Sequence, residues 1–590
     1  MKPAIRNALG TALFSSALVI AGWAHGQQAA DSVAPEIATG ISDRQAVSTG
    51  SFMVASANPH ATRAGRDVLA AGGNAIDAMV AVQFVLGLVE PQSSGIGGGA
   101  FLVYFDSAEG RLTTYDGRET APRSATPTLF LDANGEPLKF FDAVVGGRSV
   151  GTPGTLKLLH ETHKIHGKLP WPDLIQPAID LAQNGFEVSE RLFAMLSADA
   201  ERLGVHEETR LYFLGADGKP HPVGHVLTNP AYAQTLRLIA AEGADAFYRG
   251  PIADAIVETV RNGNPDNPGV LALQDLAAYE IKEREPVCLP YRGYNVCGMG
   301  PPSSGALTVG QILGILEPFD MAAQSPSDPD TWRLIGDASR LAFADRGRYM
   351  ADSDFVPMPT RGLLDRAYLD ERARLIEPGA VLQPDAVRPG APPWDHARLW
   401  ADDESIELPS TSHFSIVDAD GNVVSMTTTI ENGFGSRLKT GGFLLNNELT
   451  DFSFRTHRNG VPIANRVEPG KRPRSSMSPT IIMKDGQPYM AIGSPGGSRI
   501  IGYVAKAIIA HIDWGLDVQA AINMPHLVNR FGSFDVEKGT EAEKLAGPLE
   551  ELGYKVNIRD LNSGLHAIVI APDGLTGGAD PRREGTVEGM

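Results

Sequence analysis

The sequence contains little cysteine and has no excess of positive charge, and these two absences narrow what the chain can be. Its 590 residues include 2 cysteines, 51 lysines and arginines and 70 aspartates and glutamates, which give a formal net charge of −19. Nucleic acid is bound through surplus basic side chains that neutralise phosphates. Nucleic acid is therefore not an expected partner.

Long apolar runs are also missing beyond the N-terminus. Within residues 1–26, Lys2 and Arg6 precede an apolar run at 8–21, and small residues follow up to Gly26. This order is typical of a secretory signal peptide, whereas the alternative, a membrane anchor, needs about 20 apolar residues. No later stretch is long enough to span a bilayer. We therefore expect an exported protein, periplasmic or secreted.

The distribution of hydrophobic residues, which make up 43% of the chain, indicates a large globular core. Helical spacing covers residues 59–90, and the glycine-rich run that follows leads into a strand, which argues against a nucleotide-binding loop. Residues 150–380 alternate helical segments with loops. A proline-rich, acidic connection at 379–410 is expected to be exposed and poorly structured. Alternating strands then dominate, so we expect helices packed on both faces of stacked sheets.

The two cysteines, Cys288 and Cys297, flank a short stretch that is typical of a β-hairpin. A two-residue turn at 292–293 would place them opposite each other at a non-hydrogen-bonded pair, within disulfide reach. Export makes oxidation favourable, and two reduced core thiols are the alternative.

The stretch ELPSTSHFSIVD at 407–418 places a threonine where the irregular connection becomes a strand. A threonine hydroxyl is a weak nucleophile without a base, and its own α-amino group can be that base once the preceding peptide bond is cut. The junction between Ser410 and Thr411 is therefore a candidate cleavage site. Taken alone, a Ser-Thr-Ser run is an ordinary strand start.

Four further motifs accompany this junction. They are TTYDGRETAP at 113–122, FLLNNELTDFSF at 443–454, GKRPRSSMSPT at 470–480 and AIGSPGGSRI at 491–500. In this order they resemble the γ-glutamyltransferase (γ-glutamyl transpeptidase) family of N-terminal-nucleophile hydrolases, over nearly the whole chain after residue 26. The resemblance implies an α/β fold, a four-layer αββα sandwich.

The same resemblance implies a precursor that cleaves itself before Thr411. A large subunit of residues 27–410 and a small subunit of residues 411–590 would then form one heterodimer. The residues that match the family's catalytic positions are Thr411 as nucleophile, Thr429 as the threonine supporting its hydroxyl, and Gly496 and Gly497 as the oxyanion hole.

The resemblance also implies a pocket that recognises both charges of a glutamyl group. Arg118 would bind the α-carboxylate, with Ser475 and Ser476 adding hydroxyl donors. Glu448 and Asp451 match the positions that hold the α-ammonium.

Glu431 departs from the family pattern, in which many members carry asparagine two residues after the second threonine. A carboxylate there still accepts from an ammonium, so Glu431 favours a cationic group and disfavours a glutaryl group, which has no amine. The segment 451–475 is shorter than in members with a tyrosine-bearing lid, and it contains no tyrosine. We therefore expect a more open pocket, favouring hydrolysis or bulky acceptors.

Together these implications predict an enzyme that cleaves glutathione and related γ-glutamyl amides through a γ-glutamyl-threonine ester. Water, or the amine of an amino acid or peptide, would accept the glutamyl group, with ping-pong kinetics and no cofactor or metal. The alternatives are a cephalosporin (glutaryl-type) acylase on the same scaffold and a non-catalytic periplasmic binding protein.

Overall fold

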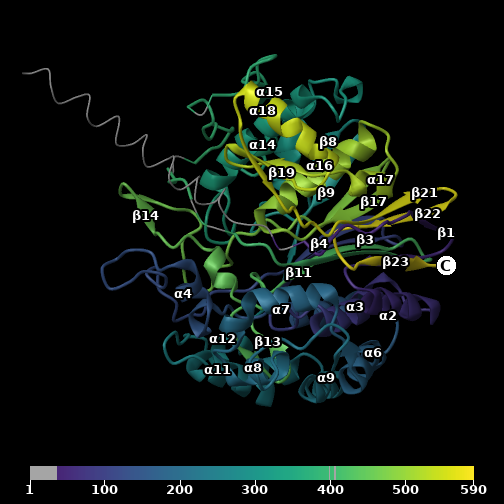
Figure 1. Cartoon of the computed structure of the whole chain (residues 1–590), viewed down its shortest axis with the longest axis vertical. Coiled ribbons are helices and arrows are strands. Elements are labelled where there is room, and N and C mark those ends of the chain that lie inside the picture. The colour runs from purple at the N-terminus through teal and green to yellow at the C-terminus, as the bar shows by residue number, and fades with distance from the viewer. Residues whose placement is uncertain (1–35, 37, 384, 397–398, 404, 406) are drawn as a thin grey trace, which may run out of the picture.

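Two stacked β-sheets with helices on their outer faces make up the protein (Figure 1). The computed structural model describes residues 36, 38–383, 385–396, 399–403, 405 and 407–590. The expected signal peptide at 1–26 lies outside the described residues. The αββα architecture predicted from the sequence is confirmed.

Both sheets have seven strands, and all neighbouring strands in them run antiparallel. The first sheet contains β1 (Val47–Thr49), β22 (Gly574–Ala579), β21 (His566–Ala571), β17 (Gln487–Gly493), β16 (Thr480–Lys484), β9 (Tyr294–Gly298) and β8 (Val287–Tyr291), in that spatial order. The second contains β23 (Thr586–Gly589), β2 (Met53–Ser56), β10 (Ser412–Val417), β11 (Val423–Thr429), β3 (Gly99–Asp106), β4 (Arg111–Gly117) and β7 (Lys282–Arg284). Each sheet therefore combines strands from both sides of Thr411.

The helices form two outer layers (Figure 1). The layer on the second sheet contains α2 (Pro59–Ala70), α3 (Ala75–Val89), α5 (Thr155–His166), α6 (Trp171–Asn184), α7 (Glu190–Leu203), α8 (Glu207–Phe213), α9 (Pro230–Glu242), α10 (Asp245–Arg249), α11 (Pro251–Asn262) and α12 (Leu273–Ala277). The layer on the first sheet contains α13 (Gly305–Leu316), α14 (Pro329–Tyr349), α15 (Arg366–Ala373), α16 (Ile500–Ile512), α17 (Val518–Asn523) and α18 (Ala546–Leu552). A short helix, α4 (Phe140–Val144), stands beside the sheets.

Smaller strand pairs complete the elements outside the two main sheets. They are β5 (Phe186–Glu187) with β6 (Val226–Leu227), β12 (Lys439–Thr440) with β13 (Phe443–Leu444), β14 (His457–Arg458) with β15 (Val461–Pro462), and the three-stranded set β18 (Leu527–Asn529), β19 (Ser533–Glu537) and β20 (Lys555–Arg559). Among the described residues, no helix is long and apolar enough to cross a membrane.

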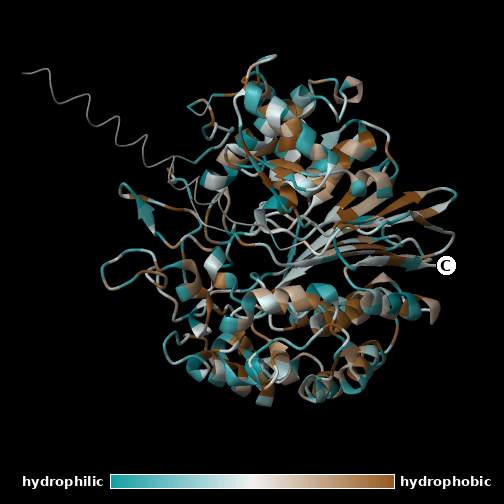
Figure 2. Cartoon of the chain, in the orientation of Figure 1, coloured by the Kyte–Doolittle hydropathy of each residue, from teal (hydrophilic) through white to brown (hydrophobic). Residues whose placement is uncertain are grey.

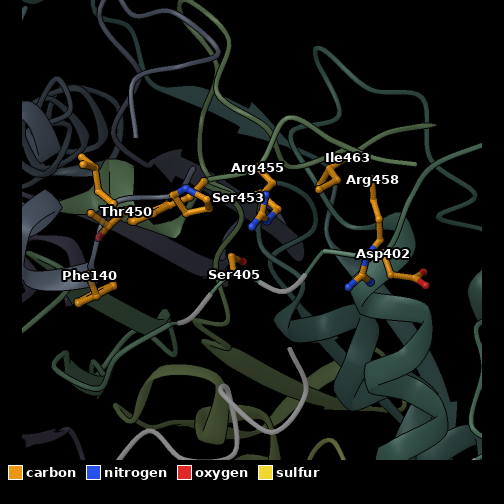
Figure 3. Close-up of a pocket in the computed structure, with 11 residues that line it drawn as sticks. Phe140, Asp402, Ser405, Thr450, Ser453, Arg455, Arg458 and Ile463 are labelled. Atoms are coloured by element: carbon orange, nitrogen blue, oxygen red, sulfur yellow. The ribbon is translucent and has the colours of Figure 1, made fainter. Parts of the chain in front are cut away.

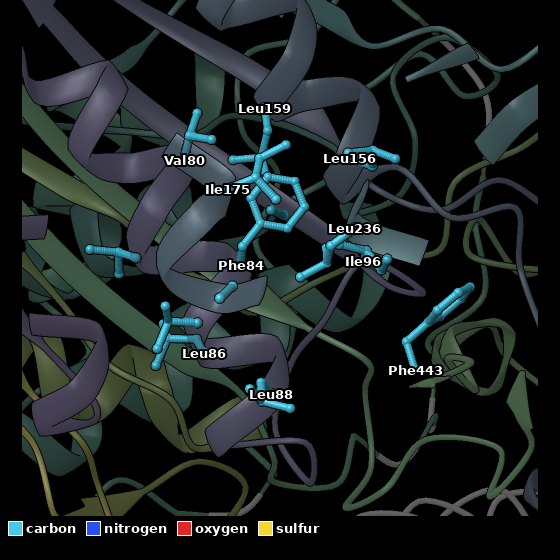
Figure 4. Close-up of a cluster of buried hydrophobic side chains, with 14 of the residues drawn as sticks. Val80, Phe84, Leu86, Leu88, Ile96, Leu156, Leu159, Ile175, Leu236 and Phe443 are labelled. Atoms are coloured by element: carbon cyan, nitrogen blue, oxygen red, sulfur yellow. The ribbon is translucent and has the colours of Figure 1, made fainter. Parts of the chain in front are cut away.

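Helix α3 is buried inside the helical layer that covers the second sheet. It is apolar on nearly every side, as expected for a helix that other helices surround, and a capping box between Asn74 and Asp77 starts it. Phe84 of α3 packs in one buried cluster with Leu159 of α5 and Ile175 of α6 (Figure 4). In Figure 2 the apolar residues are brown, and brown segments appear in the strands of the sheets and in the helices packed on them.

A separate apolar cluster joins the two sheets. Met53 and Val103 of the second sheet pack in it with Ile481 and Ile568 of the first. Burial at about 25 cal/mol per Å² of apolar surface makes such a face-to-face contact strongly stabilising. The cluster holds the two sheets against each other and includes Val417 and Val423, at the turn that joins β10 to β11.

The cysteine hairpin has the register that the sequence predicts. β8 and β9 pair antiparallel with Cys288 opposite Cys297, and their Cα atoms are 4.1 Å apart. The two sulfur atoms form a disulfide.

The connection at 379–410 follows the sequence prediction only in part. Its described residues form no helix or strand, as expected. The expectation that it is exposed is wrong for its last part, because Glu407 is 7% exposed and Ser410 is fully buried. Ion pairs described below hold this end of the segment inside the protein.

Candidate active site

Two threonine hydroxyls converge on one peptide carbonyl at the ends of two central strands of the second sheet, β10 and β11. β10 pairs with β11 so that Ser412 faces Thr428, which brings Thr411 and Thr429 to the same end of the hairpin. Thr411 Oγ1 lies 2.5 Å from the carbonyl oxygen of Ser410. Thr429 Oγ1 donates a hydrogen bond of 3.1 Å to the same oxygen. The chain is uncut here, so this carbonyl belongs to the peptide bond expected to be cleaved.

The backbone around Thr429 fixes the direction of its hydroxyl. The N–H of Glu431 donates to Thr429 Oγ1 at 2.8 Å, so the hydroxyl proton is left to point at Ser410. The glycine-rich loop before β3 packs against this turn: a Cβ on Gly98 would lie 2.0 Å from the carbonyl oxygen of Thr429. The loop therefore needs glycine for close packing under the site, which explains a motif that the sequence alone does not.

A buried arginine and a set of carboxylates lie beside the threonines. Arg118, just after β4, forms ion pairs with Glu448 and with Asp451, the latter at 2.6 Å. Its guanidinium also donates to the carbonyl oxygens of Pro473 at 3.2 Å and Arg474 at 2.8 Å. Both acidic residues belong to the 3-10 helix η4 (Glu448–Asp451). The cluster therefore presents both signs of charge within one enclosed space.

The carboxylates outnumber the guanidinium, and their pKa values reflect this. Burial raises the pKa of Glu431, Glu448 and Asp451 well above the usual range, and each of these pKa values is raised further by neighbouring carboxylates. Burial also raises the pKa of Glu119, the residue next to Arg118, to about 8. A cationic ligand in this space would relieve the repulsion.

Several carboxylate oxygens of the cluster, including both of Glu119, have no hydrogen-bond donor among the described residues. Within the part of the chain that the structure describes, Glu448 Oε2 and Asp451 Oδ1 are buried and accept no hydrogen bond. Buried acceptors of this kind are costly unless a donor reaches them. An ammonium group supplies three such donors.

Glu431 occupies a strained position. Its φ is +75°, in the left-handed region that residues with a side chain rarely adopt. Its carboxylate accepts from the side chain of Asn447 and, at 3.3 Å, from the backbone N–H of Leu408. Asn432, by contrast, accepts a hydrogen bond from Arg437 and lies outside the cavity lining.

The predicted oxyanion glycines begin the turn before α16. Gly496 and Gly497 have φ values of +138° and +58°, which favour glycine at both positions. A Cβ on Gly497 would lie 2.9 Å from the carbonyl oxygen of Leu408, so the segment before the junction passes directly over it. A Cβ on Gly496 would instead meet the ring of Tyr503 at 2.7 Å.

One cavity of about 260 Å³ collects almost all of the predicted residues. Its lining consists of Arg118, Glu407, Leu408, Thr411, Thr429, Glu431, Glu448, Asp451, Ser475, Ser476, Met477, Gly497 and Ile500. Of the predicted catalytic and substrate-binding residues, only Gly496 lies outside this lining, next to it in the chain. Among the described residues, no group of histidine, cysteine, aspartate or glutamate side chains is arranged to hold a metal ion.

The sequence interpretation missed the residues that hold the segment before the junction. The carboxylate of Glu407 contacts Arg346, the hydroxyl of Ser476, and Arg474 at 3.3 Å. Burial opposes its ionisation, but the two guanidinium groups outweigh burial and lower the pKa of Glu407 to about 2. Arg474 stands inside the quoted GKRPRSS motif, whereas Arg346 on α14 carries no local signal.

Comparisons with known proteins show which family the chain resembles. The gamma-glutamyltranspeptidase family model matches residues 61–590. The chain is 38% identical over 551 residues to the glutathione hydrolase proenzyme of Bacillus subtilis (strain 168), covering 91% of each chain. It is 36% identical over 563 residues to the acylase ACY 1 proenzyme of Pseudomonas sp. (strain SE83), covering 94% of this chain and 96% of that one. A crystal structure of cephalosporin acylase from Bacillus halodurans superposes with a TM-score of 0.82 and 29% identity, covering 94% and 99% of the two chains.

Proposed function

Because the chain belongs to the gamma-glutamyltranspeptidase family, we propose that it is a self-cleaving γ-glutamyltransferase and glutathione hydrolase with Thr411 as its nucleophile. It cleaves the γ-glutamyl amide bond of glutathione and related compounds. Water, an amino acid or a peptide accepts the glutamyl group.

The observation that carries this proposal is the charge arrangement beside Thr411. The cavity holds one guanidinium, from Arg118, and carboxylates with unused acceptor oxygens on Glu448 and Asp451. A glutamyl group carries an α-carboxylate and an α-ammonium on one carbon atom. Its carboxylate would exchange with an acidic partner of Arg118, and its ammonium would supply the missing donors. A glutaryl group has no ammonium and would leave the buried carboxylates unrelieved.

Maturation begins at the junction. Thr411 Oγ1 attacks the carbonyl carbon of Ser410, the peptide C–N bond breaks, and the nitrogen takes the hydroxyl proton. Water then hydrolyses the ester, leaving a carboxylate on Ser410 and a free amine on Thr411. The products are a large subunit that begins at about residue 27 and ends at 410, and a small subunit of residues 411–590. A signal peptide at 1–26 would direct the precursor out of the cytoplasm.

Turnover then uses the freed amine as the base. The amine of Thr411 takes the proton from its own hydroxyl, which attacks the γ-carbonyl of the donor. The N–H groups of Gly496 and Gly497 stabilise the oxyanion, and a donor of this kind is worth about 3 kcal/mol. The leaving amine takes the proton, and a γ-glutamyl ester remains on Thr411. Water or an amine completes the second half of the reaction.

The proposal is tested by N-terminal sequencing of the purified protein together with two substrate assays. We expect one chain to begin at Thr411 and a γ-glutamyl anilide to be cleaved much faster than a glutaryl amide. Faster cleavage of the glutaryl amide would assign the acylase activity of the relative instead. A single uncut chain that binds γ-glutamyl compounds without cleaving them would assign a binding protein.

A further inference from the structure

A second, larger cavity adjoins the catalytic one and has no role in the reaction described above. It contains about 720 Å³ of empty space, compared with about 260 Å³ in the catalytic cavity. Its walls include Phe140, Phe454, Arg455, Arg458, Thr450 and Ser453 (Figure 3). We call it the Phe140 cavity.

The two cavities share walls. In η4, Thr450 lines the Phe140 cavity, while its neighbour Asp451 lines the catalytic cavity. Asn447 donates to Thr450 at 3.0 Å and also donates to Glu431 of the catalytic cavity. The two cavities therefore lie on either side of one short stretch of chain around η4.

We propose that the Phe140 cavity is the subsite for the leaving group of the donor and for the acceptor, and that it takes a group bearing an aromatic ring and a carboxylate. This inference rests on the function proposed above. Size supports it first: the Phe140 cavity, with about 720 Å³ of empty space, is much larger than the catalytic cavity, with about 260 Å³. The rest of the substrate needs space elsewhere.

The aromatic preference comes from a ladder of phenylalanine rings. Phe454 stacks on Phe130, with ring centroids 4.6 Å apart, and lies nearly parallel to Phe140 at 6.4 Å. Phe140 and Phe454 both line the cavity. A ligand ring can stack on such a surface or meet it edge-on, which adds to the energy of apolar burial.

The carboxylate preference comes from Arg455. Arg455 pairs with Glu136 at 2.9 Å, but both side chains are more than half exposed, so this pair contributes little and a ligand carboxylate can replace it. Figure 3 places Arg455 between Phe140 at one end and Arg458 at the other. Arg458, which also lines the cavity, belongs to the β14–β15 hairpin.

The charges of the two cavities are complementary to the two ends of one substrate. The catalytic cavity has an excess of carboxylates and repels the carboxylate of a leaving group or acceptor. The Phe140 cavity offers the guanidinium of Arg455 to that carboxylate, and the acidic residue in its lining, Asp402, is already paired with Arg348 at 2.8 Å. A γ-glutamyl amino acid with an aromatic side chain combines both features.

Three γ-glutamyl donor substrates distinguish the contribution of the aromatic ring from that of the carboxylate. Each is tested with the processed enzyme. They are γ-glutamyl-phenylalanine, γ-glutamyl-alanine, whose leaving group has no ring, and γ-glutamyl-phenethylamide, whose leaving group has no carboxylate. Phe140→Ala should lower kcat/KM for the two aromatic donors about tenfold and change the alanine donor by less than about twofold. Arg455→Gln should lower kcat/KM about fivefold for the two donors whose leaving group carries a carboxylate, and should leave γ-glutamyl-phenethylamide unaffected.

Matched controls use side chains close by that lie outside the cavity lining. Phe141→Ala, next to Phe140, and Arg466→Gln, on the same loop as Arg455, should leave the ranking of the three donors unchanged. Maturation into two chains reports that each variant folds. Equal losses with all three donors, or no loss, would overturn the subsite. A wild-type enzyme that cleaves none of the donors would instead refute the proposed function, and the subsite with it.

Discussion

Replacing Thr429 with valine tests the geometry of self-cleavage most directly. Valine has almost the same shape, so the change removes a hydroxyl and little else. That hydroxyl donates to the carbonyl oxygen of Ser410 at 3.1 Å, in a place where both residues are buried. Negative charge develops on this oxygen when Thr411 attacks the carbonyl carbon. The hydroxyl therefore acts as an oxyanion donor for maturation.

The magnitude follows from what one such donor contributes. Loss of a preorganised oxyanion donor costs about 3–4 kcal/mol, or about 10²–10³ in rate. We expect Thr429→Val to slow conversion of the precursor into two chains by at least about a hundredfold. The assay follows freshly purified precursor on denaturing gels and fits the loss of the full-length band to a single rate constant.

The neighbouring threonine provides the matched control. Thr428 Oγ1 lies 3.4 Å from the carbonyl oxygen of Gly99, away from the junction. Thr428→Val should mature at close to the wild-type rate, and Thr429→Ser should restore most of the lost rate because it keeps the hydroxyl. If Thr429→Val matures as fast as Thr428→Val, the assignment of the hydroxyl to the scissile carbonyl is wrong.

Three further predictions concern the nucleophile, the segment before it and the acidic cluster. Thr411→Ala should give one uncut chain on a denaturing gel; a second chain in that variant would place the cleavage elsewhere. In the uncut Thr411→Ala protein, Glu407→Ala should lower the free energy of unfolding by about 3–5 kcal/mol, because Arg346 and Arg474 lose their buried carboxylate partner. An unchanged urea midpoint would contradict this expectation. Burial raises the pKa of Glu119 from 4.5 to about 8 in the folded state. Between these pH values the folded protein holds a proton on Glu119 that the unfolded chain releases, so the free energy of unfolding falls as the pH rises. The unfolding temperature of the wild type should therefore fall more between about pH 5 and about pH 9 than that of Glu119→Gln; parallel curves would exclude this account.

Local patterns carry most of what the sequence predicts correctly. The register of the cysteine hairpin depends on a turn within the same short stretch, and the strand that starts at Ser412 depends on alternation along a few residues. The burial of Glu407 depends instead on Arg346, 61 residues before it, and Arg474, 67 residues after it. An acidic residue in a proline-rich segment is typical of an exposed connection. Only the three-dimensional pairing reverses that expectation.

The pairing of Glu407 also explains how one pocket can serve both maturation and turnover. The segment before the junction is held by Arg346, Arg474 and Ser476, whereas the ion pairs proposed to receive the substrate belong to Arg118. The two anchor sets share a cavity but use different guanidinium groups.

Departure of the segment before Thr411, after the proposed cut, would empty the cavity without removing the charges proposed to bind substrate. It uncovers Gly497, which the backbone of Leu408 now covers, and it frees the carboxylate of Glu431 from the N–H of Leu408. The two chains remain joined because both sheets contain strands from either side of the cut. In the uncut chain the proposed oxyanion glycine Gly497 is covered, so we expect activity to appear only once the bond before Thr411 is broken.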